Sequence, residues 1–199
     1  MVKATFETLY AQSKHDPVPL KRIRKFAQPF EVGFALLAGA AVLFFSVLLV
    51  LSYLPGGYVT FNDEGGWLTM DPSNAPVDAL PVTAFSLKLQ IVGTLTAIFT
   101  YGSLIAALWS LHKLFGAYRR GRVFASEPIQ LMRRASFGLI AFAATPGLMQ
   151  PLMRVLDSPD RNWFHGETIT IIIAGAALFL FAHIIELGVE LERENKRFV

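Results

Sequence analysis

Length, composition and charge restrict the chain of 199 residues to few protein classes. Hydrophobic residues make up 53% of it and charged residues only 17%, whereas soluble domains average about 25% charged residues. A net charge of +3 is too small to indicate direct nucleic-acid binding, and the lack of cysteine excludes disulfides, thiolate metal sites and cysteine nucleophiles. The apolar residues come in long blocks, which predicts an integral membrane protein.

The N-terminal segment, residues 1–30, is polar and basic. Within it, Leu20, Ile23, Ala27 and Phe30 recur at helical spacing, with Lys and Arg between them. This pattern favours a short helix on a membrane surface, with its apolar side in lipid and its cations at anionic headgroups. The alternative is a solvated tail that leads into the first span.

Four apolar segments reach the length of about 20 residues that a membrane-spanning helix needs. They cover residues 32–54, 85–114, 135–156 and 168–188. The first exceeds the roughly 7–15 apolar residues of a signal peptide, so we expect it to be retained as an anchor. Pro146, Gly147 and Pro151 predict that the third is kinked, or broken near its outer end. The predicted fold is a single all-α domain, a bundle of four transmembrane helices.

The longest loop, residues 55–84, lies between the first two spans. Two β-prone runs, residues 58–61 and 67–70, flank a turn that contains two glycines, which predicts a β-hairpin. The loop has four acidic residues and no Lys or Arg. We expect a small ordered cap on the extracytoplasmic face, and a flexible connector is the alternative.

Basic residues near helix ends stay on the cytoplasmic side of a membrane. Fifteen of the 18 Lys and Arg residues lie in the N-terminal segment, the loop between spans two and three, and the C-terminal tail, residues 189–199. This distribution predicts that both termini are cytoplasmic. A basic patch is expected to face anionic lipid headgroups or a cytoplasmic partner. It comprises Lys21, Arg22, Arg24, Lys25, Arg119, Arg120, Arg122, Arg133 and Arg134.

Ionisable residues at membrane depth are candidates for a functional site. His183, Glu186 and Glu190 are spaced to share one helical face, and His112 lies near the inner end of the second span. Such a cluster suits a divalent metal or a proton relay. The alternative, which the nearby interface favours, is that these residues orient the helix and pair with Arg or Lys. No phosphate loop, metalloprotease motif or catalytic triad is present in the sequence, so we expect no catalytic residues and no cofactor.

A stretch in the second half of the chain resembles a known family. Residues 114–127, LFGAYRRGRVFASE, are similar to the helix-Gly-x-hydrophobic-Phe-Ser turn of the bacterial family called domain of unknown function 2975. A basic helix follows at residues 131–134, and residues 191–195 with the terminal Val199 resemble the end of that family's chains.

The resemblance, over about residues 105–199, implies a small four-helix protein of a bacterial inner membrane without established enzymatic activity. Members of the family often resemble partners of helix-turn-helix regulators. We therefore expect a non-enzymatic membrane protein that contacts a cytoplasmic regulatory protein. The alternative is a metal- or proton-handling subunit that uses His112, His183 and Glu186.

Overall fold

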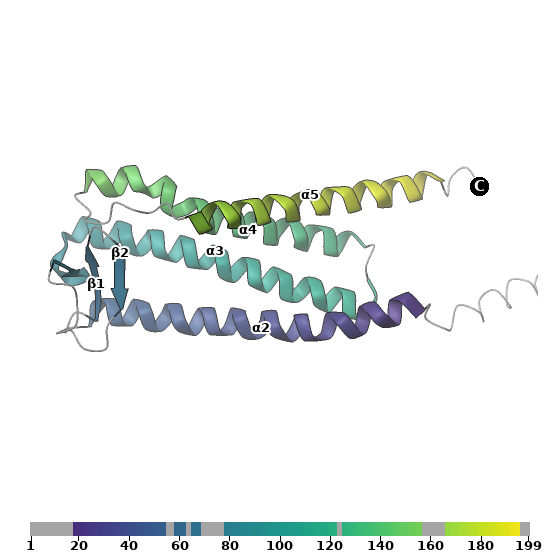
Figure 1. Cartoon of the computed structure of the whole chain (residues 1–199), viewed down its shortest axis with the longest axis horizontal. Coiled ribbons are helices and arrows are strands. Elements are labelled where there is room, and N and C mark those ends of the chain that lie inside the picture. Colours follow the sequence, from purple (N-terminus) through teal and green to yellow (C-terminus); the bar gives the residue numbers. More distant parts are fainter. Residues whose placement is uncertain are drawn as a thin grey trace, which may run out of the picture.

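Four long helices make up most of the structure, a computed structural model that describes residues 18–54, 58–62, 65–68, 78–122, 125–156 and 166–195. The helices are α2 (Val18–Tyr53), α3 (Leu87–Arg119), α4 (Ser126–Val155) and α5 (Gly166–Asn195) (Figure 1). All four are long and apolar enough to cross a membrane, as expected of a multi-pass membrane protein. The prediction of four such helices is confirmed.

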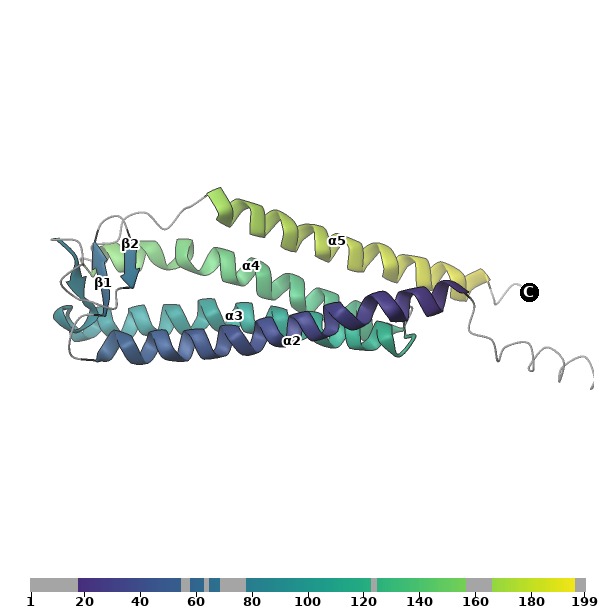
Figure 2. The same ribbon diagram turned by 60° about the horizontal axis from the view of Figure 1, so that its bottom comes forward.

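Neighbouring helices in the sequence are also neighbours in space. α2 packs on α3, α3 on α4 and α4 on α5 (Figure 2), and no other pair of these helices makes more than marginal contact among the described residues. The four helices therefore form an open row, with α2 and α5 at its two edges. In both views the N-terminal end of α5 lies nearer the middle of the molecule than the C-terminal end of α4 (Figures 1 and 2). The C-terminal end of α5 extends beyond the α3–α4 turn.

Small residues bring the helices of this row close together. A Cβ atom on Gly138 of α4 would lie only 2.8 Å from the carbonyl oxygen of Ser103 on α3. On Gly175 of α5 it would lie 2.8 Å from Cγ1 of Ile140. The buried Ser136 hydroxyl donates a hydrogen bond of 2.8 Å to the Gly175 carbonyl oxygen. Backbones that approach this closely without side chains between them set the stagger of α3, α4 and α5.

The outer faces of the helices are apolar. Leu43, Phe99, Phe137 and Ile173 represent the four helices, and each is at least 60% exposed. Water-soluble monomers rarely expose an apolar surface of this extent. Such a surface suits helices whose outer faces contact lipid.

The first helix begins earlier than the sequence predicts. α2 is continuous from Val18 through Pro29, so the separate surface helix expected before residue 32 is not present in this part of the chain. Pro29 removes only one helical hydrogen bond, to the carbonyl of Lys25. The buried Ala27 and the stacking of Phe30 on Phe115, with ring centroids 5.1 Å apart, hold the turn against α3. Packing on α3 therefore extends the helix beyond its hydropathic boundary.

The third and fourth helices differ less from expectation. α4 is one helix that contains both Pro146 and Pro151, so the broken form is not observed. α5 continues to Asn195, beyond residue 188, where the fourth apolar segment ends, and so includes part of the charged tail.

A small sheet lies at the end of the molecule opposite the α3–α4 turn, which we call the strand end (Figure 1). Strands β1 (Val59–Asn62), β2 (Gly65–Leu68) and β3 (Leu80–Pro81) pair antiparallel in the order β2-β1-β3, and the short helix η2 (Val82–Ala84) follows. Residues 63 and 64, between β1 and β2, lie outside the described residues. The β3 strand is absent from the prediction because two residues carry no readable alternation.

Candidate functional site

The α3–α4 turn is shaped by a glycine. Gly121 has φ of +78°, in the left-handed region that favours glycine. The Arg122 N–H donates to the Ala117 carbonyl at 3.0 Å, and the Gly121 N–H donates to the Tyr118 carbonyl at 2.9 Å. These two bonds form a Schellman motif, which ends α3 and satisfies its last carbonyl groups. The chain then reverses within a few residues and starts α4.

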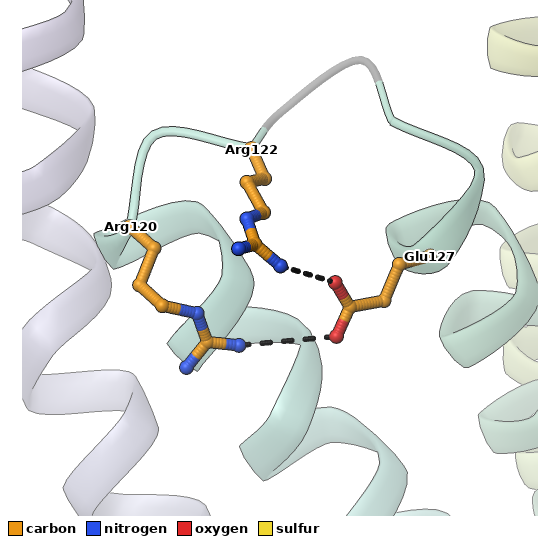
Figure 3. Close-up of polar contacts among 3 residues, drawn as sticks. All are labelled: Arg120, Arg122 and Glu127. Carbon is orange, nitrogen blue, oxygen red and sulfur yellow. Dashed lines mark hydrogen bonds and ion pairs between the residues drawn. The ribbon is translucent and has the colours of Figure 1, made fainter.

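One glutamate joins the two sides of this turn. Glu127, in the first turn of α4, lies between two arginines that follow the end of α3 (Figure 3). Its Oε2 is 3.2 Å from Nη1 of Arg122, and its Oε1 is 3.9 Å from Nη2 of Arg120. All three side chains are about half exposed, so each pair contributes roughly 0–1 kcal/mol.

A second carboxylate joins α2 to α3. Glu31 has only 13% of its side chain exposed, and its Oε2 lies 3.0 Å from Nε of Arg119. The N–H is not aligned with the oxygen, so the contact is an ion pair rather than a hydrogen bond. Gly116 makes room for it, because a Cβ there would lie 3.0 Å from Oε1 of Glu31. A carboxylate this enclosed depends on its guanidinium partner.

A third carboxylate joins α4 to α5. Arg133 donates to Oε2 of Glu186, and Nδ1 of His183 lies 3.6 Å from the same oxygen. About a third of the Arg133 and Glu186 side chains is exposed, and about half of the His183 side chain is exposed. The three residues form a polar contact at the helix interface.

Together these contacts define one end of the molecule, which we call the basic end: the start of α2, the α3–α4 turn and the end of α5 (Figure 1). There, carboxylate–arginine ion pairs join α2 to α3 and α4 to α5, and Glu127 of α4 pairs with two arginines of the α3–α4 turn. The predicted basic patch thus divides by role. Arg119, Arg120, Arg122 and Arg133 are ion-paired between elements.

The rest of the predicted patch lies at the same end. Arg24 packs against Gly121. Lys25 and Arg134 are exposed and have no ion-pair partner within the described part of the chain. Lys21 and Arg22 are on α2, but their side chains lie outside the description.

The predicted histidine–glutamate cluster is only partly assembled. His183 lies beside Glu186, but the ring of His112 faces α2, with its Nδ1 3.0 Å from the Glu31 carbonyl oxygen. Glu190 is exposed. Among the described residues, no group of three or more His, Asp or Glu is placed to hold a metal ion.

Sequence reasoning missed Glu31 as a site residue. The available signal was an acid at the edge of an apolar segment, since ionisable groups at membrane depth are costly without a partner. The sequence alone gives no helix register, so it does not identify Arg119 as that partner.

Comparison with known proteins adds no relationship to this geometry. No family model, curated protein or solved structure matches the chain.

Proposed function

We propose that the chain is a non-enzymatic, multi-pass protein of a bacterial inner membrane that binds a cytoplasmic regulatory protein at its basic end. In this proposal both termini are cytoplasmic. The concentration of Lys and Arg at the basic end supports that orientation, because such residues are retained on the cytoplasmic side. The exposed apolar faces of the four helices support the membrane location.

The observation that carries the binding role is the projecting end of α5. α5 extends past the α3–α4 turn in both views (Figures 1 and 2), so its last turns have no neighbour from that turn. Leu187 and Leu191, one turn apart, are 47% and 61% exposed. Glu190 and Glu194, also one turn apart, are exposed beside them. The helix therefore presents an apolar stripe next to an acidic one.

An amphipathic helix of this kind is recognised by a hydrophobic groove, with anchors at i and i+4. Charge complementarity calls for a groove with a basic rim. Helix-turn-helix regulators are basic on the side that meets DNA, and occupation of such a rim by α5 would compete with DNA. The resemblance to the domain of unknown function 2975 family supports the same class of partner.

Site-specific photo-crosslinking in cells tests the proposal. A photoreactive residue at Leu191 is expected to crosslink to a protein that mass spectrometry identifies as a helix-turn-helix regulator. The same residue at Ile173, an equally exposed position in the middle of α5, is the matched control and is expected to give no such adduct. The double variant Glu190→Lys/Glu194→Lys should abolish the Leu191 adduct. Adducts of the same proteins at both positions, or lipid adducts alone at Leu191, would contradict the proposal.

A proton-linked role remains the alternative that one contact favours, the approach of His183 to Glu186. A metal-dependent form of it would require ligands beyond those gathered in the described residues. Elemental analysis of the purified protein, compared with His183→Ala, separates the two forms. Stoichiometric metal that the substitution removes would establish the metal-dependent form.

A further inference from the structure

Four arginines gather around the last turn of α3 and the residues after it. We call Arg24, Arg119, Arg120 and Arg122 the arginine cluster. Nη2 of Arg24 would be 2.7 Å from a Cβ on Gly121, so this guanidinium lies directly against the glycine. Nη1 of Arg120 would be 3.5 Å from a Cβ on Gly116, in the space that the Glu31 carboxylate also enters. The C-terminal end of a helix attracts cations, which favours this gathering.

The cluster has more positive than negative charge. Three of its guanidinium groups, those of Arg119, Arg120 and Arg122, face two carboxylates, Glu31 and Glu127, so these five groups carry a net charge of +1. The side chains of Arg119, Arg120 and Arg122 are 49% to 60% exposed, so an external anion can reach them. The cluster is thus open to a ligand that supplies the missing negative charge.

Apolar side chains on α2 lie at the same level as the cluster. Phe26 is 70% exposed and Phe30 is 52% exposed, and they are one turn apart. Phe30 and Phe34 both stack on Phe115 of α3, with their ring centroids 5.1 Å and 5.5 Å from that of Phe115. An aromatic surface therefore continues from the arginines along the α2–α3 seam toward the middle of the helices. This order, cations at the end and exposed apolar rings next to them, matches a headgroup above its acyl chains.

We propose that the α2–α3 seam binds one anionic phospholipid, with its phosphate among the arginines of the cluster and an acyl chain along Phe26 and Phe30. The inference rests on the proposed membrane location and assigns a ligand to the basic end. Guanidinium groups bind phosphate oxygens through paired N–H donors, so the arginines suit this headgroup better than lysines would. A free anion would bind the arginines but would have no acyl chain to contact the exposed phenylalanines.

Native mass spectrometry of the full chain in neutral detergent measures this binding. The probes are phosphatidylglycerol, phosphatidylcholine and glycerol 3-phosphate. A basic residue near a membrane surface contributes about 1 kcal/mol of attraction to anionic lipid, which is about a fivefold change in affinity. The double variant Arg24→Gln/Arg120→Gln is therefore expected to bind phosphatidylglycerol about 25-fold more weakly than the wild type.

The matched control removes two positive charges elsewhere. Lys88→Gln/Arg154→Gln changes exposed residues outside the cluster, both at the strand end, and should change the affinity less than twofold. Melting temperatures in the same detergent establish that each variant is folded. If the double variant does not fold, Arg120→Gln alone, at a half-exposed position, should give about a fivefold loss.

Three results would overturn the inference. An equal loss in both double variants would mean general attraction by net charge. Equal binding of phosphatidylcholine would mean that the headgroup charge is not recognised. Displacement of phosphatidylglycerol by an equal concentration of glycerol 3-phosphate would mean a free-anion site. Because binding is measured on purified protein, a negative result leaves the crosslinking at Leu191 untouched, and the two proposals fail separately.

Discussion

The two ends of the molecule are held together by different forces. At the basic end, three carboxylates pair with arginines: Glu31 joins α2 to α3, Glu127 joins α4 to the turn that follows α3, and Glu186 joins α5 to α4. At the strand end, the hydroxyls of Tyr53 and Thr94 join α2 to α3, and a small sheet packs beside them. α5 does not reach that end (Figure 2), and Leu148, Leu152 and Val155 of α4 are exposed there. Ion pairs thus join the helices at the basic end, and the residues that the structure describes at the strand end include no equivalent ion pair.

The largest effect on stability is expected in the middle of the row of helices, where the backbones of α3 and α4 approach most closely. Gly138→Leu forces a side chain against Ser103 and Ala107, because even its Cβ would lie 2.8 Å from a backbone oxygen and 2.9 Å from the Ala107 Cβ. We expect a loss of about 3 kcal/mol in unfolding free energy, at the upper end for overpacking. Denaturant unfolding in detergent measures it. Gly102→Leu is the control, since nothing lies within 4 Å of that position. Equal losses at both glycines would contradict the close approach.

The second-largest effect on stability compares two carboxylates at the basic end, the enclosed Glu31 and the exposed Glu127. Glu31→Gln leaves Arg119 without its partner and should cost about 2 kcal/mol, in the range for hydrogen-bonded or paired charges that are partly buried. Glu127→Gln removes a similar carboxylate from an exposed site and should cost less than about 1 kcal/mol. The same unfolding experiment compares the two. A larger loss from Glu127→Gln would reverse the proposed order.

A smaller effect tests the turn that brings the arginines together. Gly121→Ala places a Cβ on a residue with φ of +78° and against the Arg24 guanidinium. The cost of a left-handed conformation for a residue other than glycine is about 1–2 kcal/mol, so we expect a loss of about 1 kcal/mol or slightly more. Gly33→Ala, in an open helical position, serves as the comparison and should not destabilise the protein. Equal stability of the two variants would argue against the Schellman turn.

The smallest effect concerns the hydrogen bond between α4 and α5. Ser136→Ala removes the donor to the Gly175 carbonyl, and bonds of this type in membrane proteins average about 0.6 kcal/mol. Thr145→Ala removes a hydroxyl that bonds only within α4, to the Ala141 carbonyl, and should cost less. Thermal unfolding in detergent ranks the pair. A larger loss from Thr145→Ala would show that the interhelical bond contributes little.

Apolar length alone predicts four helices, and the concentration of Lys and Arg predicts which helix ends belong together. Apolar length does not predict where α2 begins. Glu31 and the arginines before it lower the hydropathy there, although the packing of α2 on α3 continues. Nor does apolar length predict the partners of Glu31 and Glu186. The partner of Glu186 depends on the stagger of α4 and α5, which the close backbone contact at Gly175 sets. The partner of Glu31 depends on the packing of α2 on α3, where Phe30 stacks on Phe115 and Gly116 leaves room for the carboxylate. His112 illustrates the same limit, since a one-dimensional pattern does not show that its ring faces α2.

Single-cysteine labelling tests the central claim, that the two ends lie on opposite sides of a membrane. The chain has no cysteine, so each substitution introduces the only thiol. In intact spheroplasts, a membrane-impermeant thiol reagent is expected to label Asp78→Cys at the strand end and not Arg122→Cys at the basic end. After lysis, both should be labelled. Labelling of Arg122→Cys before lysis, or of both variants alike, would contradict the proposed topology and the cytoplasmic location of the basic end.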